Sequence, residues 1–239
     1  MKEKILVLGM GGNAHLFCEM CKETGIAVIL LGSVDNIDSY LKDNDIIVQF
    51  LDDSLDVSVV AVAGSVKGSQ IWLCESIDQS VTAMAKQAGS PERYVGFSLS
   101  GLFPEKKLVE LIGGERTADD AMAVARDLFE KLQFTVVIAQ DRSGRVLNRV
   151  VASMINEAVY VSMYNLAKME DIDQMMRLGA NFPMGPFEYA DAVGLDRVLK
   201  TLEWLTEEIG PQYLPCPLLR RKVEAGFLGR KTGRGFYTY

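Results

Sequence analysis

The stretch KILVLGMGGNAHLFCEMCKETGIAVILLG, residues 4–32, decides the fold class of this chain. It reads as an apolar strand, a glycine-containing turn, a helix that runs to about Glu23, and a second apolar strand. Two strands joined through a helix pair in parallel, because a short hairpin cannot connect them. The sequence therefore opens as the β–α–β unit of a parallel sheet.

The same alternation continues to about residue 140. The helix-like stretches SIDQSVTAMAKQA and TADDAMAVARDLFEKL each begin with Ser or Thr, which favour helix N-caps. Further short apolar runs, each of strand length, are DIIVQFL, VSVVAVA, SQIWLCE, YVGFSL, KLVELIGG and FTVVIAQD. Alternating strands and helices predict an α/β doubly wound sheet.

The turn GMGGNA has the spacing G-x-G-x-x-A of dinucleotide-binding turns. Gly9 would permit the tight turn, and Gly11 would let a pyrophosphate approach the backbone N–H groups. Ala14 would permit close packing of the helix on the strand. We therefore expect these three residues to bind a dinucleotide.

The end of the second strand does not complete this pattern. Gly32 stands where a carboxylate that binds the ribose is expected, and the nearest acid is Asp35. The bulky His15 and Leu16 follow Ala14, where small residues usually lie. A glycine-rich turn without a ligand therefore also fits the sequence.

From Arg145 onward the sequence has no convincing strand. RVLNRVVASMINEAVYVSMYNLAKM carries a wide apolar stripe over 146–159, which predicts a helix that is buried on most sides. The remaining helical stretches are separated by Pro and Gly. We expect a Rossmann-like dinucleotide-binding domain over 1–143 and an all-helical domain over 144–239, with the boundary at DRSG, residues 141–144.

Composition narrows the class of protein. A formal net charge of -7 leaves no basic face for nucleic acid or anionic lipid. The sequence shows no signal-peptide cleavage pattern and no apolar run of membrane-spanning length, so we expect a cytoplasmic protein. Cys18, Cys21, Cys74 and Cys216 lack metal-ligand spacing and are expected to be buried free thiols, so no metal site is predicted.

Three stretches of the second half carry a resemblance to a known family. GRVLNRVVASMINEAVYV, EDIDQMMRLGANFPMGPFEYADAVGLD and PLLRRKVEAGFLGRKTGRGFYTY closely resemble the C-terminal domain of the 3-hydroxyacyl-CoA dehydrogenase family. GMGGNA, DIIVQF, IWLCES and VGFSLSGLFPEKKLVELIGGERT resemble its NAD-binding domain more weakly. Only residues 33–44 separate AVILLG from DIIVQF, where the family has a long helical excursion that helps to cover acyl-CoA and adenine.

The resemblance assigns roles to individual positions. In the family, a histidine in an H-F-F-N-P segment takes the hydroxyl proton as hydride leaves for NAD, and a glutamate in L-V-E-V-I orients that imidazole. Glu110 in LVELI matches the glutamate, whereas Ser98 falls at the histidine and Gly101 at the asparagine of the segment. Ile77 replaces a serine that helps to bind the substrate oxygen. The only histidine, His15, is expected in a capping or packing role.

Two residues of the second half also match family positions. Asn148 in VLNR matches the active-site asparagine, and Lys231 in GRKTG matches a lysine that contacts the cofactor. Asn148 would equally serve as a hydrogen-bonding residue within a domain junction, because a buried amide needs partners in any case. Lys231 would equally belong to a solvated tail.

The resemblance implies NAD-dependent oxidation of 3-hydroxyacyl-CoA to 3-oxoacyl-CoA. A serine has no proton affinity near neutrality, so Ser98 predicts weak or absent activity. The alternative is a non-catalytic member that holds acyl-CoA and forms a homodimer through its helical domain, or pairs with a homologous subunit. A different β-hydroxyacid dehydrogenase is disfavoured, because the sequence lacks the catalytic lysine motif that such an enzyme would need.

Overall fold

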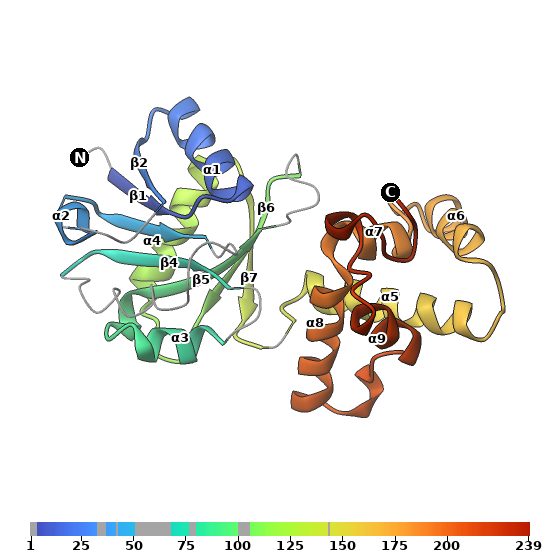
Figure 1. Ribbon diagram of the computed structural model, residues 1–239. Coiled ribbons are helices and arrows are strands. Elements are labelled where there is room, and N and C mark those ends of the chain that lie inside the picture. Colours follow the sequence, from blue (N-terminus) through green and yellow to red (C-terminus); the bar gives the residue numbers. More distant parts are fainter. Residues whose placement is uncertain are drawn as a thin grey trace. The chain divides into compact units, whose positions relative to one another are not determined.

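The computed structural model describes residues 4–32, 37–41, 43–50, 68–76, 80–99, 106–142 and 144–239. Backbone proximity divides the chain into two units, Met1–Arg142 (unit 1) and Ser143–Tyr239 (unit 2). Figure 1 shows a sheet with flanking helices in unit 1 and helices in unit 2. The expected strand VSVVAVA, and with it Asp35, Ile77 and Gly101, lies outside the described residues.

Unit 1 is built around a seven-stranded sheet in the order β2-β1-β3-β4-β5-β6-β7. Every neighbouring pair is parallel except β5 and β6, which are antiparallel. The strands are β1 (Lys4–Leu8), β2 (Ala27–Leu31), β3 (Ile46–Gln49), β4 (Ile71–Glu75), β5 (Tyr94–Leu99), β6 (Leu108–Gly113) and β7 (Thr135–Gln140). The helices described in this unit are α1 (Gly12–Glu23), α2 (Ile37–Leu41), α3 (Val81–Gln87) and α4 (Asp119–Lys131). The α/β class with a mostly parallel sheet is therefore confirmed.

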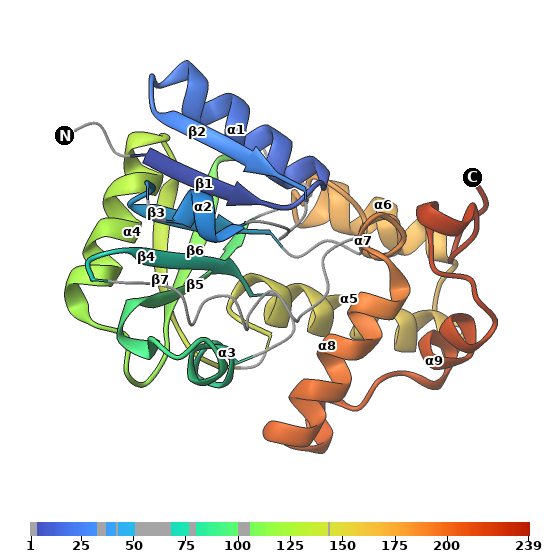
Figure 2. The same cartoon turned by 60° about the vertical axis from the view of Figure 1, so that its left-hand side comes forward.

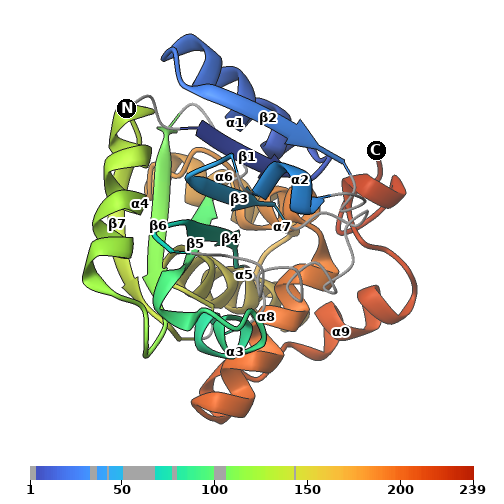
Figure 3. The ribbon, with the colours of Figure 1, turned by 90° about the vertical axis from the view of Figure 1, so that its left-hand side faces the viewer.

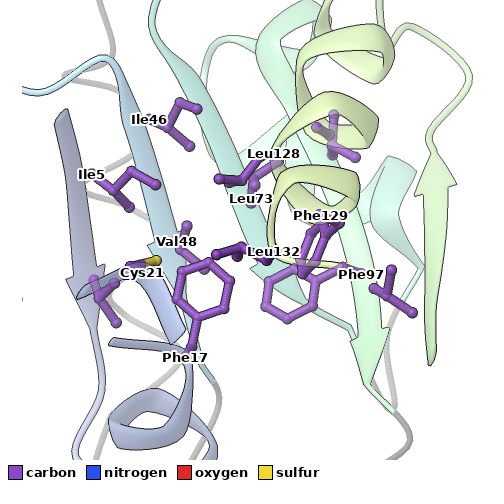
Figure 4. Packing of buried hydrophobic residues seen from close by; sticks show 14 of the residues in the cluster. Ile5, Phe17, Cys21, Ile46, Val48, Leu73, Phe97, Leu128, Phe129 and Leu132 are labelled. Carbon is purple, nitrogen blue, oxygen red and sulfur yellow. The ribbon is translucent and has the colours of Figure 1, made fainter. Parts of the chain in front are cut away.

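Helices cover both faces of the sheet. Side chains of α1 and α4 join one buried cluster, and those of α2 and α3 join another. Figure 3 shows α4 and α3 on opposite sides of the strands. In Figure 4, Phe17, Phe97 and Phe129 come together from α1, β5 and α4. The ring centroids of Phe97 and Phe129 lie 5.5 Å apart, and each buried phenylalanine contributes about 1.5–3 kcal/mol.

Both helix starts expected from the sequence lie further along the chain. The N-cap of α3 is Ser80, and that of α4 is Ala118. Thr117 does not cap α4, because its hydroxyl donates to the Tyr94 carbonyl oxygen and accepts from the Gly114 N–H. A hydroxyl that finds backbone partners in a turn fixes that turn instead of the helix.

An aspartate that follows β7 holds the beginning of α3. Oδ2 of Asp141 accepts hydrogen bonds from the Ser80 hydroxyl and the Thr82 N–H, both at 2.8 Å, and Oδ1 accepts from the Val81 N–H at 2.9 Å. Burial alone would raise the pKa of Asp141, but these hydrogen bonds hold it below its usual range. Gly96 lets α3 pack closely on the sheet, because an added Cβ would collide with Cγ2 of Val81.

Unit 2 contains helices that pack around an apolar core. They are α5 (Leu147–Met163), α6 (Met169–Gly179), α7 (Pro186–Val193), α8 (Leu195–Glu208) and α9 (Pro217–Glu224). The core includes Ile155, Phe187 and Leu202. Most residues of α5 are buried or half-buried, whereas Val150 in its first turn is 63% exposed. No helix in the described parts of the chain is both long and apolar enough to span a membrane.

Two buried aspartates hold residues 229–239, which we call the C-terminal segment. Asp173 accepts hydrogen bonds from the Phe187 N–H at 2.8 Å and the Tyr237 hydroxyl at 2.9 Å. Asp191 accepts from the Phe236 N–H at 2.8 Å, the Tyr237 N–H at 2.9 Å and the Tyr239 hydroxyl at 3.2 Å. These carboxylates satisfy backbone donors that would otherwise be buried without partners.

Candidate active site

The carboxyl ends of β1, β3 and β4 form one edge of the sheet. Leu8 pairs with Gln49, and Gln49 pairs with Cys74, so the next residues along the three strands are level. These residues are Gly9, Phe50 and Glu75. Figure 2 shows the heads of β1, β2 and β4 at this edge. Ligands of open α/β sheets bind outside the carboxyl ends of the strands, so the edge is the candidate site.

The glycine turn leaves β1 at this edge. Gly9 has φ +133°, a conformation that favours glycine, and its N–H donates to the Leu31 carbonyl oxygen at 3.0 Å. A Cβ at Gly9 would lie 3.1 Å from Cβ of Phe50. Gly11 is the N-cap of α1, and Ala14 is a fully buried residue in the first turn of that helix. The three residues therefore form a tight turn that leads into a closely packed helix.

The turn fits the diphosphate of a dinucleotide. A Cβ added at Gly12 would meet nothing within 4 Å among the described residues, so these leave open space beside the start of α1. The N–H groups of a helix N-terminus and its dipole attract anions. These features match the expectation for Gly9, Gly11 and Ala14, whose role in binding stays a prediction.

At the end of β2, the side chain of Met10 occupies the space beside Gly32, where a ribose-binding carboxylate was expected. Met10 lies against Gly32, because a Cβ added at Gly32 would collide with the sulfur of Met10. Any acid introduced at position 32 would have to displace this side chain. At the end of β2, the described residues therefore include no carboxylate at the position where one would bind the adenosine ribose.

Ser98 and Glu110 are direct neighbours across the antiparallel pair β5–β6. Residues directly opposite in such a pair have Cβ atoms about 4.5–5.5 Å apart. Ser98 is 7% exposed and Glu110 is 5% exposed. Both side chains point toward the face that carries α3, as Gly96 and Ile112 do two residues away. The structure thus brings together the two positions that sequence comparison assigned to a base and its orienting acid.

His15 does not lie on the face of the sheet that carries Ser98 and Glu110. It lies on α1, which packs on the face of the sheet opposite to α3. Together with Cys18 and Lys22 it lines a cavity of about 130 Å³ between α1 and β2. Since the chain has one histidine, no imidazole lies against Glu110.

The cysteines of unit 1 are buried, as expected. Burial raises the pKa of Cys21 and that of Cys74 to about 12 each. Cys18 lies in the same helix as Cys21, and burial raises its pKa as well. No group of three His, Cys, Asp or Glu side chains among the described residues is placed to hold a metal ion.

The two candidate residues of unit 2 differ in their surroundings. Asn148 is the second residue of α5 and is half-buried, and its amide has no hydrogen-bond partner within the described ranges. Nζ of Lys231 lies 2.6 Å from Oδ2 of Asp196, and the two side chains are 46% and 37% exposed. Lys231 is therefore already in an ion pair, and its contact with a cofactor stays a prediction.

Sequence reasoning gave no role to Glu75, the last residue of β4. Only 4% of Glu75 is exposed, and its Oε1 accepts a hydrogen bond of 3.3 Å from the amide of Asn13. Asn13 is the second residue of α1, directly after the glycine turn. The signal in the sequence was an acid at the end of the apolar run IWLCE, because burial of a carboxylate is costly unless it has a hydrogen-bond or ionic partner.

Comparisons with known proteins point to one family. Residues 144–239 match the family model of the 3-hydroxyacyl-CoA dehydrogenase C-terminal domain. A 3-hydroxybutyryl-CoA dehydrogenase of Clostridioides difficile is 34% identical over 216 residues, which cover 88% of this chain and 77% of that protein. The crystal structure of (S)-3-hydroxybutyryl-CoA dehydrogenase from Ralstonia eutropha superposes with a TM-score of 0.91 at 29% identity, over 100% of this chain and 99% of that one.

A second relative matches more strongly over a shorter stretch. A probable 3-hydroxybutyryl-CoA dehydrogenase of Bacillus subtilis is 46% identical over 164 residues, which cover 66% of this chain. The match spans 56% of the length of that relative, little more than half.

Proposed function

This chain belongs to the 3-hydroxyacyl-CoA dehydrogenase family, and from that premise we propose that it binds NAD and a 3-hydroxyacyl-CoA but transfers hydride weakly or not at all. In this proposal unit 1 holds the dinucleotide. The family reaction is the oxidation of a 3-hydroxyacyl-CoA to a 3-oxoacyl-CoA.

The observation that carries the proposal is the pairing of Ser98 with Glu110. Hydride can leave a hydroxyl-bearing carbon only if a base removes the hydroxyl proton. A serine hydroxyl at this place can donate a hydrogen bond, but near neutral pH it cannot accept and keep a proton. Loss of a positioned base typically lowers the rate by about two to four orders of magnitude, or roughly 3–5 kcal/mol.

The remaining candidate residues have roles in binding under this proposal. NAD supplies the hydride acceptor when it is bound. Gly9, Gly11 and Ala14 shape the turn that receives its diphosphate, and Lys231 matches a family lysine that contacts the cofactor. Asn148 would bind the substrate oxygen, for which its unpartnered amide is suited.

The test introduces an imidazole at position 98 and measures whether the rate of hydride transfer rises. NADH binding is measured by fluorescence titration, and reduction of acetoacetyl-CoA is assayed for the unmodified protein and for Ser98→His. We expect NADH binding by both proteins and a gain of at least a hundredfold in rate for Ser98→His alone.

Two control variants separate the base from its surroundings. Ser98→Ala should behave as the unmodified protein does, because serine is not acting as a base. Ser98→His combined with Glu110→Gln should lose most of the gain, because the imidazole lacks its orienting carboxylate. Rapid turnover by the unmodified protein would exclude the proposal, and failure to bind NADH would exclude a dinucleotide site.

The second candidate function is a non-catalytic subunit that forms a homodimer through unit 2 or pairs with a homologous chain. Exposed apolar side chains in and before α6 support it: Leu166, Met175 and Leu178 are 73%, 67% and 76% exposed. Apolar groups gathered at one surface commonly mark an interface. Light scattering should show a dimer that Leu178→Lys weakens, whereas the control Lys200→Glu, a charge change at an exposed residue of α8, should not weaken it. A monomer in both cases would contradict self-association.

A further inference from the structure

We propose that Glu75 tunes the cofactor preference of this chain toward oxidised nicotinamide. The inference rests on the proposed binding of NAD to unit 1 and concerns a residue of this chain to which the family resemblance assigned no role. Its carboxylate would stabilise the positive charge of the oxidised ring, which the reduced ring does not carry.

The position of Glu75 follows from the register of the sheet. It ends β4, at the level of Phe50, which follows β3, and of Gly9, which follows β1. Neighbouring strands lie about 4.8 Å apart, so Glu75 is about 10 Å along the edge from the glycine turn. The carboxylate therefore stands beside the diphosphate turn and not within it.

The side chain of Glu75 lies beside the first turn of α1 and accepts a hydrogen bond there. Its side chain points to the face of the sheet that α1 covers, because it pairs with Phe97, which is buried on that face. There the Asn13 amide donates to Oε1, and Asn13 belongs to the first turn of α1. The positive end of a helix and a hydrogen-bond donor both stabilise a carboxylate.

The nicotinamide half of the cofactor would lie on the same side of the turn as Glu75. A doubly wound sheet binds the two halves of a dinucleotide on either side of the switch point, with the pyrophosphate at the first helix. The adenosine half lies toward β2, where the ribose-binding acid is normally found. The other half then extends over the ends of β3 and β4, and β4 ends in Glu75.

The charges of the two cofactor forms make the effect specific. NAD⁺ and NADH carry the same diphosphate, so repulsion between it and Glu75 cancels when their affinities are compared. Only NAD⁺ carries a positive ring. Two opposite unit charges about 8 Å apart at an effective dielectric constant of about 20 change an affinity by at least about tenfold.

The experiment compares the dissociation constants of NAD⁺ and NADH by calorimetry. The variants are Glu75→Gln, which removes the charge at nearly constant shape, and Glu115→Gln, which removes an exposed charge elsewhere in unit 1. We expect Glu75→Gln to shift the ratio of the two constants about tenfold toward NADH, and Glu115→Gln to leave the ratio unchanged. Glu75→Asp keeps the charge and should keep most of the preference.

Each other result has a defined meaning. If Glu75→Gln binds both forms with the original ratio, or gains affinity equally for both, the inference is wrong while the proposed dinucleotide site stands. If the unmodified protein binds neither form, both proposals fail. If Glu75→Gln does not fold, Glu75→Asn supplies the same comparison with a shorter neutral side chain.

Discussion

The Tyr237 hydroxyl donates a hydrogen bond of 2.9 Å to Oδ2 of Asp173 and thereby ties the C-terminal segment to α6. The same carboxylate accepts N–H groups at the start of α7. Burial raises the pKa of Asp173, although the hydrogen bonds oppose this shift. One side chain thus joins three parts of unit 2 that are distant in sequence.

Removal of the Tyr237 hydroxyl tests this connection. We expect Tyr237→Phe to lower the free energy of unfolding by about 1.5–3 kcal/mol, because a buried carboxylate loses a donor. Urea denaturation followed by circular dichroism measures the change. Tyr164→Phe is the matched control, since Tyr164 is exposed and should change stability by less than about 0.5 kcal/mol. Equal effects of the two changes would refute the role of the hydrogen bond.

The cap formed by Asp141 should be visible as a dependence of stability on pH. We expect Asp141→Asn to lose about 1–3 kcal/mol at pH 7, because an amide accepts the N–H groups of Val81 and Thr82 less well. The pKa of Asp141 is lowered in the folded protein, so its contribution is present above the usual carboxyl pKa of about 3.9 and is lost as pH falls through the folded value.

The unfolding free energies of the unmodified protein and Asp141→Asn should therefore converge below about pH 4. Asp127→Asn, an exposed change on α4, provides the control and should show no such convergence. A difference that is constant between pH 7 and pH 3 would mean that the charge of Asp141 does not support α3.

The contact between Gly96 and Val81 makes a steric prediction. Gly96→Ala should destabilise the protein by about 1–3 kcal/mol, because the new methyl group pushes α3 away from β5. In the Val81→Ala background the same change should cost less than about 1 kcal/mol, since the colliding methyl group is gone. Gly12→Ala is the control, because its methyl group enters open space. Additive effects of the two substitutions would show that the side chains do not meet.

The thiols should be unreactive while the protein is folded. With a pKa of about 12, Cys21 and Cys74 carry almost no thiolate at pH 8, and Cys18 and Cys216 are also buried. We expect slow modification by a disulfide reagent in the native state and rapid reaction of four thiols in denaturant. Rapid labelling of any cysteine in the native protein, located by mass spectrometry, would contradict this burial.

The strands and helices of the sheet could be predicted because the sequence patterns that determine them are local. The stretch 4–32 gave the β–α–β unit from apolar runs and glycines alone. YVGFSL and KLVELIGG were each predicted as strands from their apolar runs, and the structure pairs them as β5 and β6, which sets Ser98 opposite Glu110. Such features depend on residues close together in the chain, where periodicity and turn residues determine the outcome.

The parts that were missed depend on partners far away in sequence. Glu75 accepts a hydrogen bond from Asn13, which lies 62 residues earlier in the chain. Asp141 accepts one from the Val81 N–H at the start of α3, which lies 60 residues earlier. Met10 lies over Gly32 because β1 and β2 are adjacent. No local pattern reports such contacts, since they appear only when the strands have assembled. The binding roles of Asn148 and Lys231 stay predictions.

The register of β5 and β6 is set by main-chain hydrogen bonds and the hydrophobic pattern, not by the Ser98 and Glu110 side chains. The backbone thus fixes which two positions face each other, and the side chains at these positions can change while the pairing persists. A histidine could therefore take the place of Ser98 without changing which residues of β5 and β6 are paired.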